Sequence, residues 1–196
     1  MINLKVIIAS TREGRKGPSV AAWIFEKAKK HAEFNTELLD LAKINLPFLN
    51  EPEPPSKKKY TKQYTKDWSA IIEPAEAFIV VTPEYNYGYP ATLKNAFDTI
   101  YQEWNNKPIA FVSYGGIAGG TRAVQSLQPV LTALKLIPIS ENIHIASFTN
   151  FIDEQGKFNA NETHEKSAGK MFKELEHWVN ILNEVRIKSL NILPDK

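Results

Sequence analysis

The sequence predicts an α/β protein with a five-stranded parallel sheet and helices on both faces. Short β-rich apolar runs alternate along the chain with segments whose apolar residues recur at helical spacing. No internal repeat or low-complexity tract interrupts this alternation. Alternating strands and helices place successive strands in one parallel sheet through right-handed crossovers. With 196 residues, the chain is most simply one domain, long enough to bury a core.

The expected strands are short and largely apolar. Residues 4–9 (LKVIIA) are apolar except at Lys5, and residues 77–81 (AFIVV) are apolar throughout, as expected of strands buried on both faces. The other strands are expected at residues 36–41 and 108–113 and within residues 137–145.

Helical spacing predicts helices between and after these strands. Pro18 opens the first of them, because proline is well tolerated in a first turn. The helices are expected at residues 18–28, 60–72, 92–101, 123–134 and 162–182. This division gives a domain over residues 1–183 and a C-terminal tail over residues 184–196.

Composition excludes several classes of protein. The chain has no cysteine, so disulfides, zinc–thiolate sites and thiol nucleophiles are excluded. Its net charge of +2 is too small to suggest a nucleic-acid binder. The four histidines show no metal-ligand spacing, and the Gly-x-Ser-x-Gly elbow of serine hydrolases is missing. Neither a signal peptide nor an apolar stretch of about 20 residues is present, so we expect a soluble, cytoplasmic protein.

Three chemically unusual loops follow the first, third and fourth predicted strands. They cover residues 10–19, 83–90 and 114–120. In an open parallel sheet, ligands bind outside the carboxyl ends of the strands, where the strand order reverses. With the strand order 2-1-3-4-5, the first, third and fourth strands are neighbours. The three loops would then line one crevice.

The first loop suits a phosphate group. It offers the hydroxyls of Ser10, Thr11 and Ser19 and backbone N–H groups that lead into a helix. Arg12 or Arg15 can add charge-assisted contacts. The alternative is a solvated basic turn. The loop contains neither the P-loop pattern nor the glycine pattern of dinucleotide-binding sites.

The other two loops suit a flat ring. The second loop, TPEYNYGYP, holds three tyrosines whose faces, together with backbone amides, fit a heteroaromatic ring. The third, YGGIAGG, holds four of the nine glycines of the chain, which permit close approach of the backbone to a ligand. The alternatives are an aromatic turn that caps the core and a flexible connector. Taken together, the three loops predict a ligand site.

Three stretches of the chain carry a resemblance to a known family. They are Ser10-Thr11-Arg12 with Gly17, Ser19 and Val20, then TPEYNYGYPATLKNAFD at residues 82–98, and SYGGIAGGTRA at residues 113–123. On these residues the chain resembles the NADPH-dependent FMN reductases, flavodoxin-like enzymes that include quinone, chromate and azo-dye reductases. The order of elements agrees over nearly the whole chain. One departure is Ala9, where the family usually has glycine.

The resemblance implies a flavodoxin-like three-layer sandwich and a set of FMN-binding residues. The phosphate would be held by Ser10, Thr11, Arg12, Ser19 and Val20. The isoalloxazine ring would be flanked by Pro83, Glu84, Tyr85 and Asn86 on one side and by Ser113, Tyr114, Gly115 and Gly116 on the other.

The activity implied by the resemblance is hydride transfer. NADPH or NADH would reduce FMN at N5, and the reduced flavin would pass two electrons to a quinone or a similar small acceptor. Because the cofactor carries the chemistry, no side chain is expected to be an obligatory acid, base or nucleophile. The backbone N–H of Gly115 or Gly116 could stabilise negative charge on the reduced flavin. Arg122 could meet an NADPH phosphate, or could serve only as a residue of a first helical turn.

A second class of function is non-enzymatic: a flavodoxin-like electron shuttle, or a redox sensor whose interactions depend on the flavin. The basic first loop favours the enzyme, because classical shuttles surround FMN with acidic residues. The resemblance also implies a homodimer or a dimer of dimers. Apolar residues at and after the end of the helix at 92–101 suggest a subunit interface, namely Phe97, Ile100, Tyr101 and Trp104. The triplet Lys57–Lys59 is expected to be a solvated loop.

Overall fold

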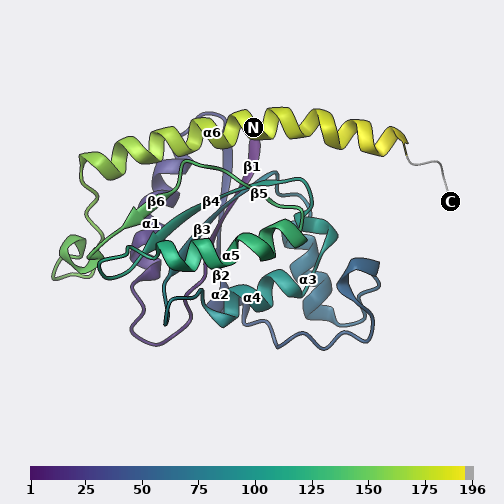
Figure 1. Cartoon of the computed structure of the whole chain (residues 1–196), viewed down its shortest axis with the longest axis horizontal. Coiled ribbons are helices and arrows are strands. Elements are labelled where there is room, and N and C mark those ends of the chain that lie inside the picture. The colour runs from purple at the N-terminus through teal and green to yellow at the C-terminus, as the bar shows by residue number, and fades with distance from the viewer. Residues whose placement is uncertain (193–196) are drawn as a thin grey trace.

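A parallel sheet with helices on both faces forms the centre of the molecule (Figure 1). It is seen in a computed structural model that describes the backbone of residues 1–192 and the side chains of residues 1–183. The strand order is β2-β1-β3-β4-β5, with β6 also paired to β4, and every pairing is parallel. The strands are β1 (Ile2–Ile8), β2 (Phe34–Asp40), β3 (Ala77–Pro83), β4 (Pro108–Tyr114), β5 (Ile137–Pro138) and β6 (Ile143–Ile145). The predicted fold class and strand order are confirmed.

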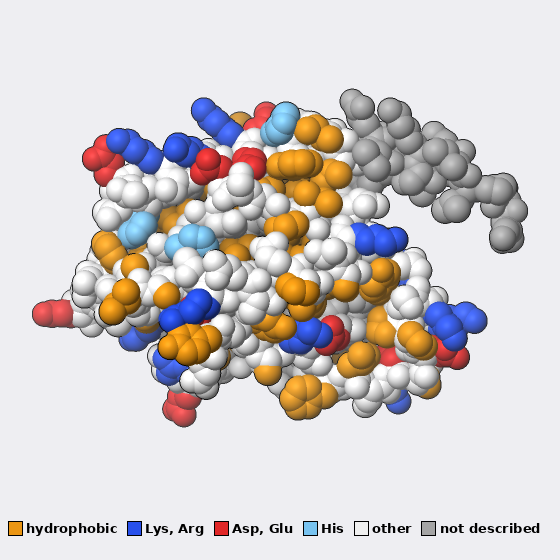
Figure 2. All heavy atoms as spheres, in the orientation of Figure 1, with side chains coloured by type: hydrophobic (Ala, Val, Ile, Leu, Met, Phe, Trp, Pro, Cys, Tyr) orange, Lys and Arg blue, Asp and Glu red, His pale blue; other side chains and the backbone are white. Residues whose placement is uncertain are grey.

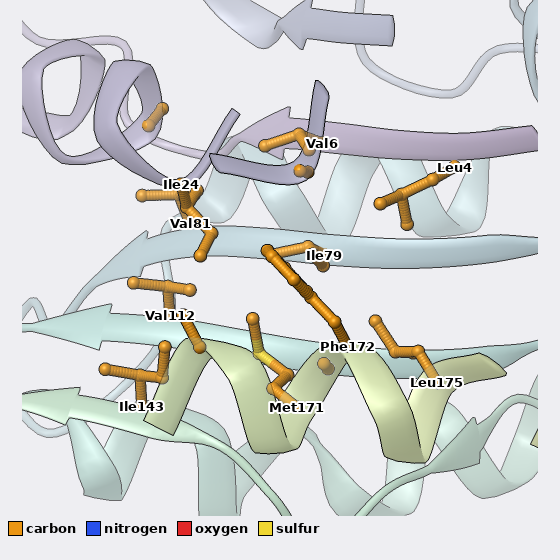
Figure 3. Close-up of a cluster of buried hydrophobic side chains, with 14 of the residues drawn as sticks. Leu4, Val6, Ile24, Ile79, Val81, Val112, Ile143, Met171, Phe172 and Leu175 are labelled. Carbon is orange, nitrogen blue, oxygen red and sulfur yellow. The ribbon is translucent and has the colours of Figure 1, made fainter. Parts of the chain in front are cut away.

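Alternation of side chains along the strands divides the core in two. One cluster lies between the sheet and the helices α1 (Gly17–Lys29) and α6 (Glu162–Ile192). Figure 3 shows its strand residues, among them Val6, Ile79 and Val112, gathered against Phe172 and its neighbours on α6. The other cluster lies beneath α3 (Gln63–Ile72), α4 (Ala91–Asp98) and α5 (Thr121–Ala133). All seven residues of β3 and all seven of β4 are buried, because these strands are covered on both faces.

The edge position predicted as one strand within residues 137–145 is occupied by two short strands. Strand β5 ends at Pro138, whose missing N–H lies on the side away from β4, because Ile137 and Ile139 donate the hydrogen bonds to β4, both at 3.0 Å. The intervening turn is tied to β4 by the side chain of Asn142, whose Oδ1 accepts a hydrogen bond from the Phe111 N–H at 2.7 Å. The chain then rejoins β4 at Ile143. An amide side chain therefore replaces the missing ladder bond between the two strands.

The apolar residues predicted to form a subunit interface are instead largely buried within the chain. Helix α4 ends at Asp98, and a 3-10 turn follows at Gln102–Trp104. Phe97, Ile100 and Trp104 are each 0% exposed, and only Tyr101 is partly exposed. The Trp104 ring packs on Phe97 and Phe78, with ring centroids 5.1 and 5.0 Å apart. The suggestion of an interface at these residues was therefore wrong, because the core under α3 and α4 uses this apolar surface.

The remaining segments adjust the predicted boundaries. A short helix α2 (Leu41–Ile44) follows β2, and further 3-10 turns lie at Pro55–Lys57 and Phe148–Phe151. In the basic triplet, Lys57 pairs with Glu53 and Lys58 pairs with Glu73. Helix α6 was predicted to end near residue 182 and continues to Ile192. Of the predicted tail, residues 193–196 lie outside the described residues, and the domain boundary at residue 183 stays a prediction.

The surface shows no dominant sign of charge. On the face seen in Figure 2, basic and acidic side chains are intermingled with apolar ones, in keeping with the net charge of +2. Among the described residues, no helix is both long enough and apolar enough to cross a membrane.

Candidate functional site

The three predicted loops meet at the carboxyl edge of the sheet. The pairing of β3 with β4 sets Thr82 beside Ser113 and Pro83 beside Tyr114, so the loops after these strands start next to each other. Together with the loop after β1, they surround a cleft of about 350 Å³. The cleft is lined by Arg12, Arg15, Lys16, Pro83, Glu84, Tyr85, Tyr114, Gly115, Gly116 and Phe148. A small-molecule site on this fold is expected at this edge of the sheet, and clefts of this size are typical of such sites.

A glycine allows the first loop to approach the end of β4. Gly17 begins α1 with its backbone against the hydroxyls of Ser10 and Tyr114. A Cβ at this position would lie 2.7 Å from the Tyr114 hydroxyl oxygen and closer still to Ser10 Oγ. Any side chain would therefore push the start of α1 away from the cleft.

Arg15 is held by a carboxylate on the neighbouring strand. Its guanidinium makes two parallel hydrogen bonds to Asp40, at 2.6 and 2.7 Å, and a third to the carbonyl of Ser10 at 2.5 Å. Both side chains are largely buried, with 17% and 11% exposed. The hydrogen bond from Arg15 lowers the pKa of Asp40, and the same bond raises the pKa of Arg15. Arg15 therefore braces the loop.

Arg12 differs from Arg15 in being available to a ligand. Its side chain is exposed, and its guanidinium donates to the adjacent carbonyl of Glu13 at 3.2 Å and to no other described residue. It also lines the cleft. Arg12 is thus the guanidinium of this loop that is free to meet an anion.

Unsatisfied polar groups at the start of α1 fit a phosphate. The hydroxyl oxygens of Ser10 and Ser19 are buried without a well-formed hydrogen bond to any described residue, although Ser10 lies near enough to Tyr114 to affect its pKa. No side chain caps the N-terminus of α1. The N–H groups of Ser19 and Val20 already donate to the carbonyl of Lys16, at 3.1 and 3.5 Å. The two buried hydroxyls are costly unless a ligand or water satisfies them, and phosphate oxygens do so well.

Four predicted phosphate ligands do not line the cleft, namely Ser10, Thr11, Ser19 and Val20. Ser19 lines a separate cavity between α1 and the start of α6. The side chain of Val20 is buried in the core. Thr11 is partly buried and lies in a small pocket beside α2. The structure thus brings Arg12, Arg15 and the start of α1 to the cleft, while Thr11 and Ser19 line two other pockets.

The second loop is a tight hairpin. Tyr85 and Gly88 exchange two backbone hydrogen bonds of 2.9 Å, and the two residues between them have positive φ, 49° at Asn86 and 67° at Tyr87. Two left-handed residues make the turn that matches the twist of a hairpin. This conformation is uncommon for a residue other than glycine and most unusual for a bulky one such as tyrosine.

Arg122 of α5 holds this hairpin in place. Its guanidinium carbon lies 4.0 Å from the centroid of the Tyr87 ring. The same guanidinium pairs with the buried carboxylate of Glu84, which also accepts a hydrogen bond from the Arg122 N–H at 3.2 Å. Arg122 lies in the first turn of α5, as one of its two expected roles required, and its contact with an NADPH phosphate stays a prediction. Its side chain is 44% exposed.

The third loop supplies backbone to the cleft. Gly115 and Gly116 line it, beside the buried ring of Tyr114. Burial raises the pKa of Tyr114 to about 12, so this hydroxyl stays protonated at neutral pH. Gly120 has φ of 81°, and a Cβ there would lie 2.8 Å from Ser113 Cβ, which explains the glycine at the start of α5.

Two predicted ring-flanking residues, Asn86 and Ser113, do not line the cleft. The side chain of Ser113 is held by other partners. Its hydroxyl donates to the carbonyl of Gly119 at 2.7 Å and lies 2.6 Å from Nδ1 of His144. A serine hydroxyl has one proton, and here it is donated to Gly119. In the contact between Ser113 and His144, the imidazole Nδ1–H is therefore the donor and the hydroxyl oxygen the acceptor. Burial lowers the pKa of His144, so the neutral ring is favoured. Ser113 thereby ties the glycine-rich loop to β6.

The sequence reasoning missed Asp40 and Phe148. Asp40 ends β2 and braces Arg15, and an acidic residue at the carboxyl end of a neighbouring strand was the available signal. Phe148 packs on Tyr114, with ring centroids 5.0 Å apart, and no local pattern pointed to it. Among the described residues, no group of acidic residues and histidines could hold a metal ion.

The sheet has the strand order of flavodoxin-like proteins, and the cleft lies where that order reverses. One loop there suits a phosphate and two suit a flat ring. These features define a flavodoxin-like nucleotide-binding protein. Residues 2–151 match the model of the NADPH-dependent FMN reductases, and the chain belongs to this family. The family implies FMN as the cofactor and NAD(P)H as the co-substrate.

Curated relatives agree with this membership. The chain is 44% identical over 133 residues to an NAD(P)H-dependent FMN reductase of Schizosaccharomyces pombe, covering 67% of this chain and 66% of that protein, just under two thirds of its length. It is 37% identical over 142 residues to one of Saccharomyces cerevisiae, covering 67% of this chain and 74% of that protein. Among solved structures, the flavoenzyme NAD(P)H:(acceptor) oxidoreductase FerB of Paracoccus denitrificans has the same fold, with a TM-score of 0.71, 20% identity, and 94% and 98% of the two chains covered.

Proposed function

We propose that this protein is an NAD(P)H-dependent FMN oxidoreductase that passes electrons to quinones or similar small acceptors. The observation that carries the proposal is the loop before α1, where the exposed guanidinium of Arg12 lines the cleft and the hydroxyl of Ser10 is buried without a hydrogen bond to any described residue. When bound there, FMN would accept hydride from the nicotinamide and pass two electrons on.

The side chains of the first loop would divide two tasks. Arg12 would bind the phosphate, together with the hydroxyls of Ser10, Thr11 and Ser19 and the N–H groups that run to Val20. Arg15 would act as a positioning residue, since Asp40 already occupies its guanidinium. A direct phosphate contact of Arg15 remains a prediction.

The ring would lie between the hairpin and the glycine-rich loop. Pro83, Glu84, Tyr85 and Asn86 would flank it on one side, mostly through backbone groups, and Tyr114, Gly115 and Gly116 on the other. Because Tyr114 keeps its proton, it can only act as a neutral hydrogen-bond partner at working pH.

One backbone N–H is suited to stabilise negative charge on the reduced ring. The N–H of Gly115 already donates to the carbonyl of Ile145 at 3.2 Å, whereas that of Gly116 has no backbone acceptor among the described residues. Of the two glycines considered, we therefore assign this role to Gly116. The proposal needs no side chain as an obligatory acid or base.

The acceptor, the assembly and the location are the finer parts of the proposal. Relatives include NADPH azoreductases as well as FMN reductases, so small planar acceptors such as quinones or azo compounds are the expected class. We also propose a homodimer or a dimer of dimers in the cytoplasm. Light scattering coupled to size exclusion would test the assembly.

The activity is tested by reconstitution. The purified protein is loaded with FMN, freed of excess cofactor, and mixed with NADPH or NADH in the presence and absence of a quinone. We expect a yellow protein whose flavin is reduced by a nicotinamide nucleotide and reoxidised by the quinone. An Arg12→Gln variant should bind FMN on the order of tenfold more weakly, since a charge-assisted hydrogen bond contributes about 1.5–3 kcal/mol.

Two outcomes would contradict the proposal in different ways. A protein that neither binds FMN nor is stabilised by it against heat would exclude the flavin site. A yellow protein that ignores both nicotinamide nucleotides would instead leave the electron shuttle or redox sensor.

A further inference from the structure

A second cavity lies along the outer face of α1, apart from the cleft described above. Its volume is about 720 Å³, twice that of the cleft. Its walls come from the outer face of α1, from the hairpin at residues 152–158 and from the start of α6. None of its lining residues lines the cleft. One lining residue, Ser19, is also among the phosphate ligands proposed above, and the activity makes no use of the others.

The floor of this cavity is aromatic and held in position. Trp23 and Phe158 pack together with ring centroids 5.2 Å apart and an interplanar angle of 55°. The indole N–H of Trp23 donates to Glu165 at 2.7 Å, and the same carboxylate pairs with Lys27. The indole is thus fixed from both sides, as expected of a preformed site.

The hairpin that forms the outer wall is also ordered by its own contacts. Asp153 accepts hydrogen bonds from the N–H groups of Gln155 and Lys157, at 3.1 and 2.8 Å, and from the Asn159 side chain at 3.0 Å. Gly156 takes φ of 79° at the tip. A short antiparallel bridge joins Ile152 to Phe158. These contacts set Lys157 at the rim of the cavity.

The uncompensated charge around the cavity is positive. Lys27 is neutralised by Glu165, and Glu26 pairs with Lys29. Lys30 and Lys157 also line the cavity, and neither forms an ion pair with any described residue. Lys157 also interacts electrostatically with the carboxylate of Asp153. Two ammonium groups without an ion pair at the rim of an aromatic pocket favour a ligand with a flat apolar body and an anionic end.

The geometry points to a second ligand site, for a planar aromatic carboxylate or sulfonate, formed by Trp23 and Phe158 with Lys30 and Lys157. The ring stacks on the aromatic floor, and the anionic group faces the two lysines. This site is separate from the cofactor cleft, so both can be occupied together.

Calorimetric titration of the FMN-loaded protein with 2-naphthalenesulfonate tests this site. We expect saturable binding at one site, with the flavin absorbance unchanged throughout. The neutral analogue 2-naphthalenemethanol should bind several-fold more weakly. The double variant Lys30→Gln/Lys157→Gln should lose about threefold to thirtyfold in affinity, the range expected for two exposed charge contacts.

Two further variants make the test specific to the cavity. Ala22 is exposed and lines the cavity, so Ala22→Trp should fill it and abolish binding without removing a contact. The control Lys66→Gln/Lys173→Gln makes the same change in charge at exposed positions outside the cavity, and should bind as the unchanged protein does. Thermal denaturation establishes that each variant is folded.

The site would be disproved by the absence of saturable binding, by binding that survives Ala22→Trp, or by release of FMN during the titration. Equal affinity for the neutral analogue would overturn the anionic class of ligand. If the protein fails to bind FMN at all, the proposed function fails, but the same titration of the cofactor-free protein still decides the second site.

Discussion

The guanidinium of Arg122 lies over the ring of Tyr87, with 4.0 Å between the guanidinium carbon and the ring centroid. The contact joins the first turn of α5 to the tip of the hairpin that borders the cleft. Because Tyr87 occupies a left-handed conformation, the contact offsets part of the conformational cost at this turn.

We predict that Arg122 and Tyr87 are energetically coupled. Arg122→Ala should destabilise the protein, and the loss should be smaller by about 0.5–1 kcal/mol in a Tyr87→Gly background, where glycine adopts the turn freely. A double-mutant cycle from urea denaturation measures this difference. Equal losses in both backgrounds would show that the ion pair with Glu84 alone accounts for the effect of Arg122.

Gly17 is expected to be essential to the geometry of the cleft. Gly17→Ala would introduce a methyl group against the hydroxyls of Ser10 and Tyr114, and overpacking of this kind costs about 1–3 kcal/mol. We expect FMN affinity to fall at least tenfold, as measured by flavin fluorescence.

Gly169 provides the matched control for Gly17. It lies within α6, and a Cβ there meets no atom within 4 Å. Gly169→Ala should stabilise the protein by about 0.5–1 kcal/mol through helix propensity and should leave FMN affinity unchanged. An unchanged affinity in Gly17→Ala as well would mean that the start of α1 does not touch the cofactor.

The pair of Arg15 and Asp40 predicts a dependence of stability on pH. The pKa of Asp40 is lowered in the folded state, so its contribution is fully present above the ordinary value of 3.8 and is lost as the pH falls through the lowered pKa. Asp40→Asn should cost about 1–3 kcal/mol at pH 7, and the difference from the unchanged protein should shrink below pH 4. Asparagine can still cap α2, so the substitution tests the charge.

Urea denaturation at pH 7 and at pH 3 measures this effect. A cost that stays constant between the two pH values would indicate that the carboxylate is not the source of the stabilisation. The FMN affinity of the same variant then reports whether the brace on Arg15 matters for the cofactor.

The N–H of Gly116 is expected to matter for the rate of flavin reduction. Gly116→Pro removes this donor, and loss of one such donor slows a charge-developing step by on the order of 10²-fold. Gly116→Ala keeps the N–H, and its added Cβ would meet no atom within 4 Å, so it should be nearly neutral. Stopped-flow measurement of flavin reduction by NADPH compares the two. A normal rate for the proline variant would refute the role of this N–H.

Contacts within single elements were predictable from the sequence, and contacts between distant segments were not. The continuous apolar runs of β3 and β4 predicted their burial and place in the sheet. Nothing near Arg15 indicated that Asp40, 25 residues later, would hold it. The apolar surplus after α4 was read as an interface because the aromatic packing under α3 cannot be seen from helical spacing alone.

The candidate site was predicted well at its loops and poorly at its side chains. Strand order brought the three loops to one cleft, since carboxyl ends of neighbouring parallel strands coincide. The side chain of Ser113 points away from the cleft because it contacts His144 on β6. Ser19 lines a different cavity, one wall of which comes from α6. Both depend on elements that pack only in the complete fold.

The divided edge of the sheet also bears on solubility. An unbroken edge strand offers a row of free N–H and C=O groups to which a strand of another molecule can add. Here the outermost position is held by strands of two and three residues, separated by a turn, and Pro138 presents no N–H. Each of the two edge strands is therefore too short for a strand of another molecule to pair with it. The interruption protects this edge of the sheet against aggregation by strand addition.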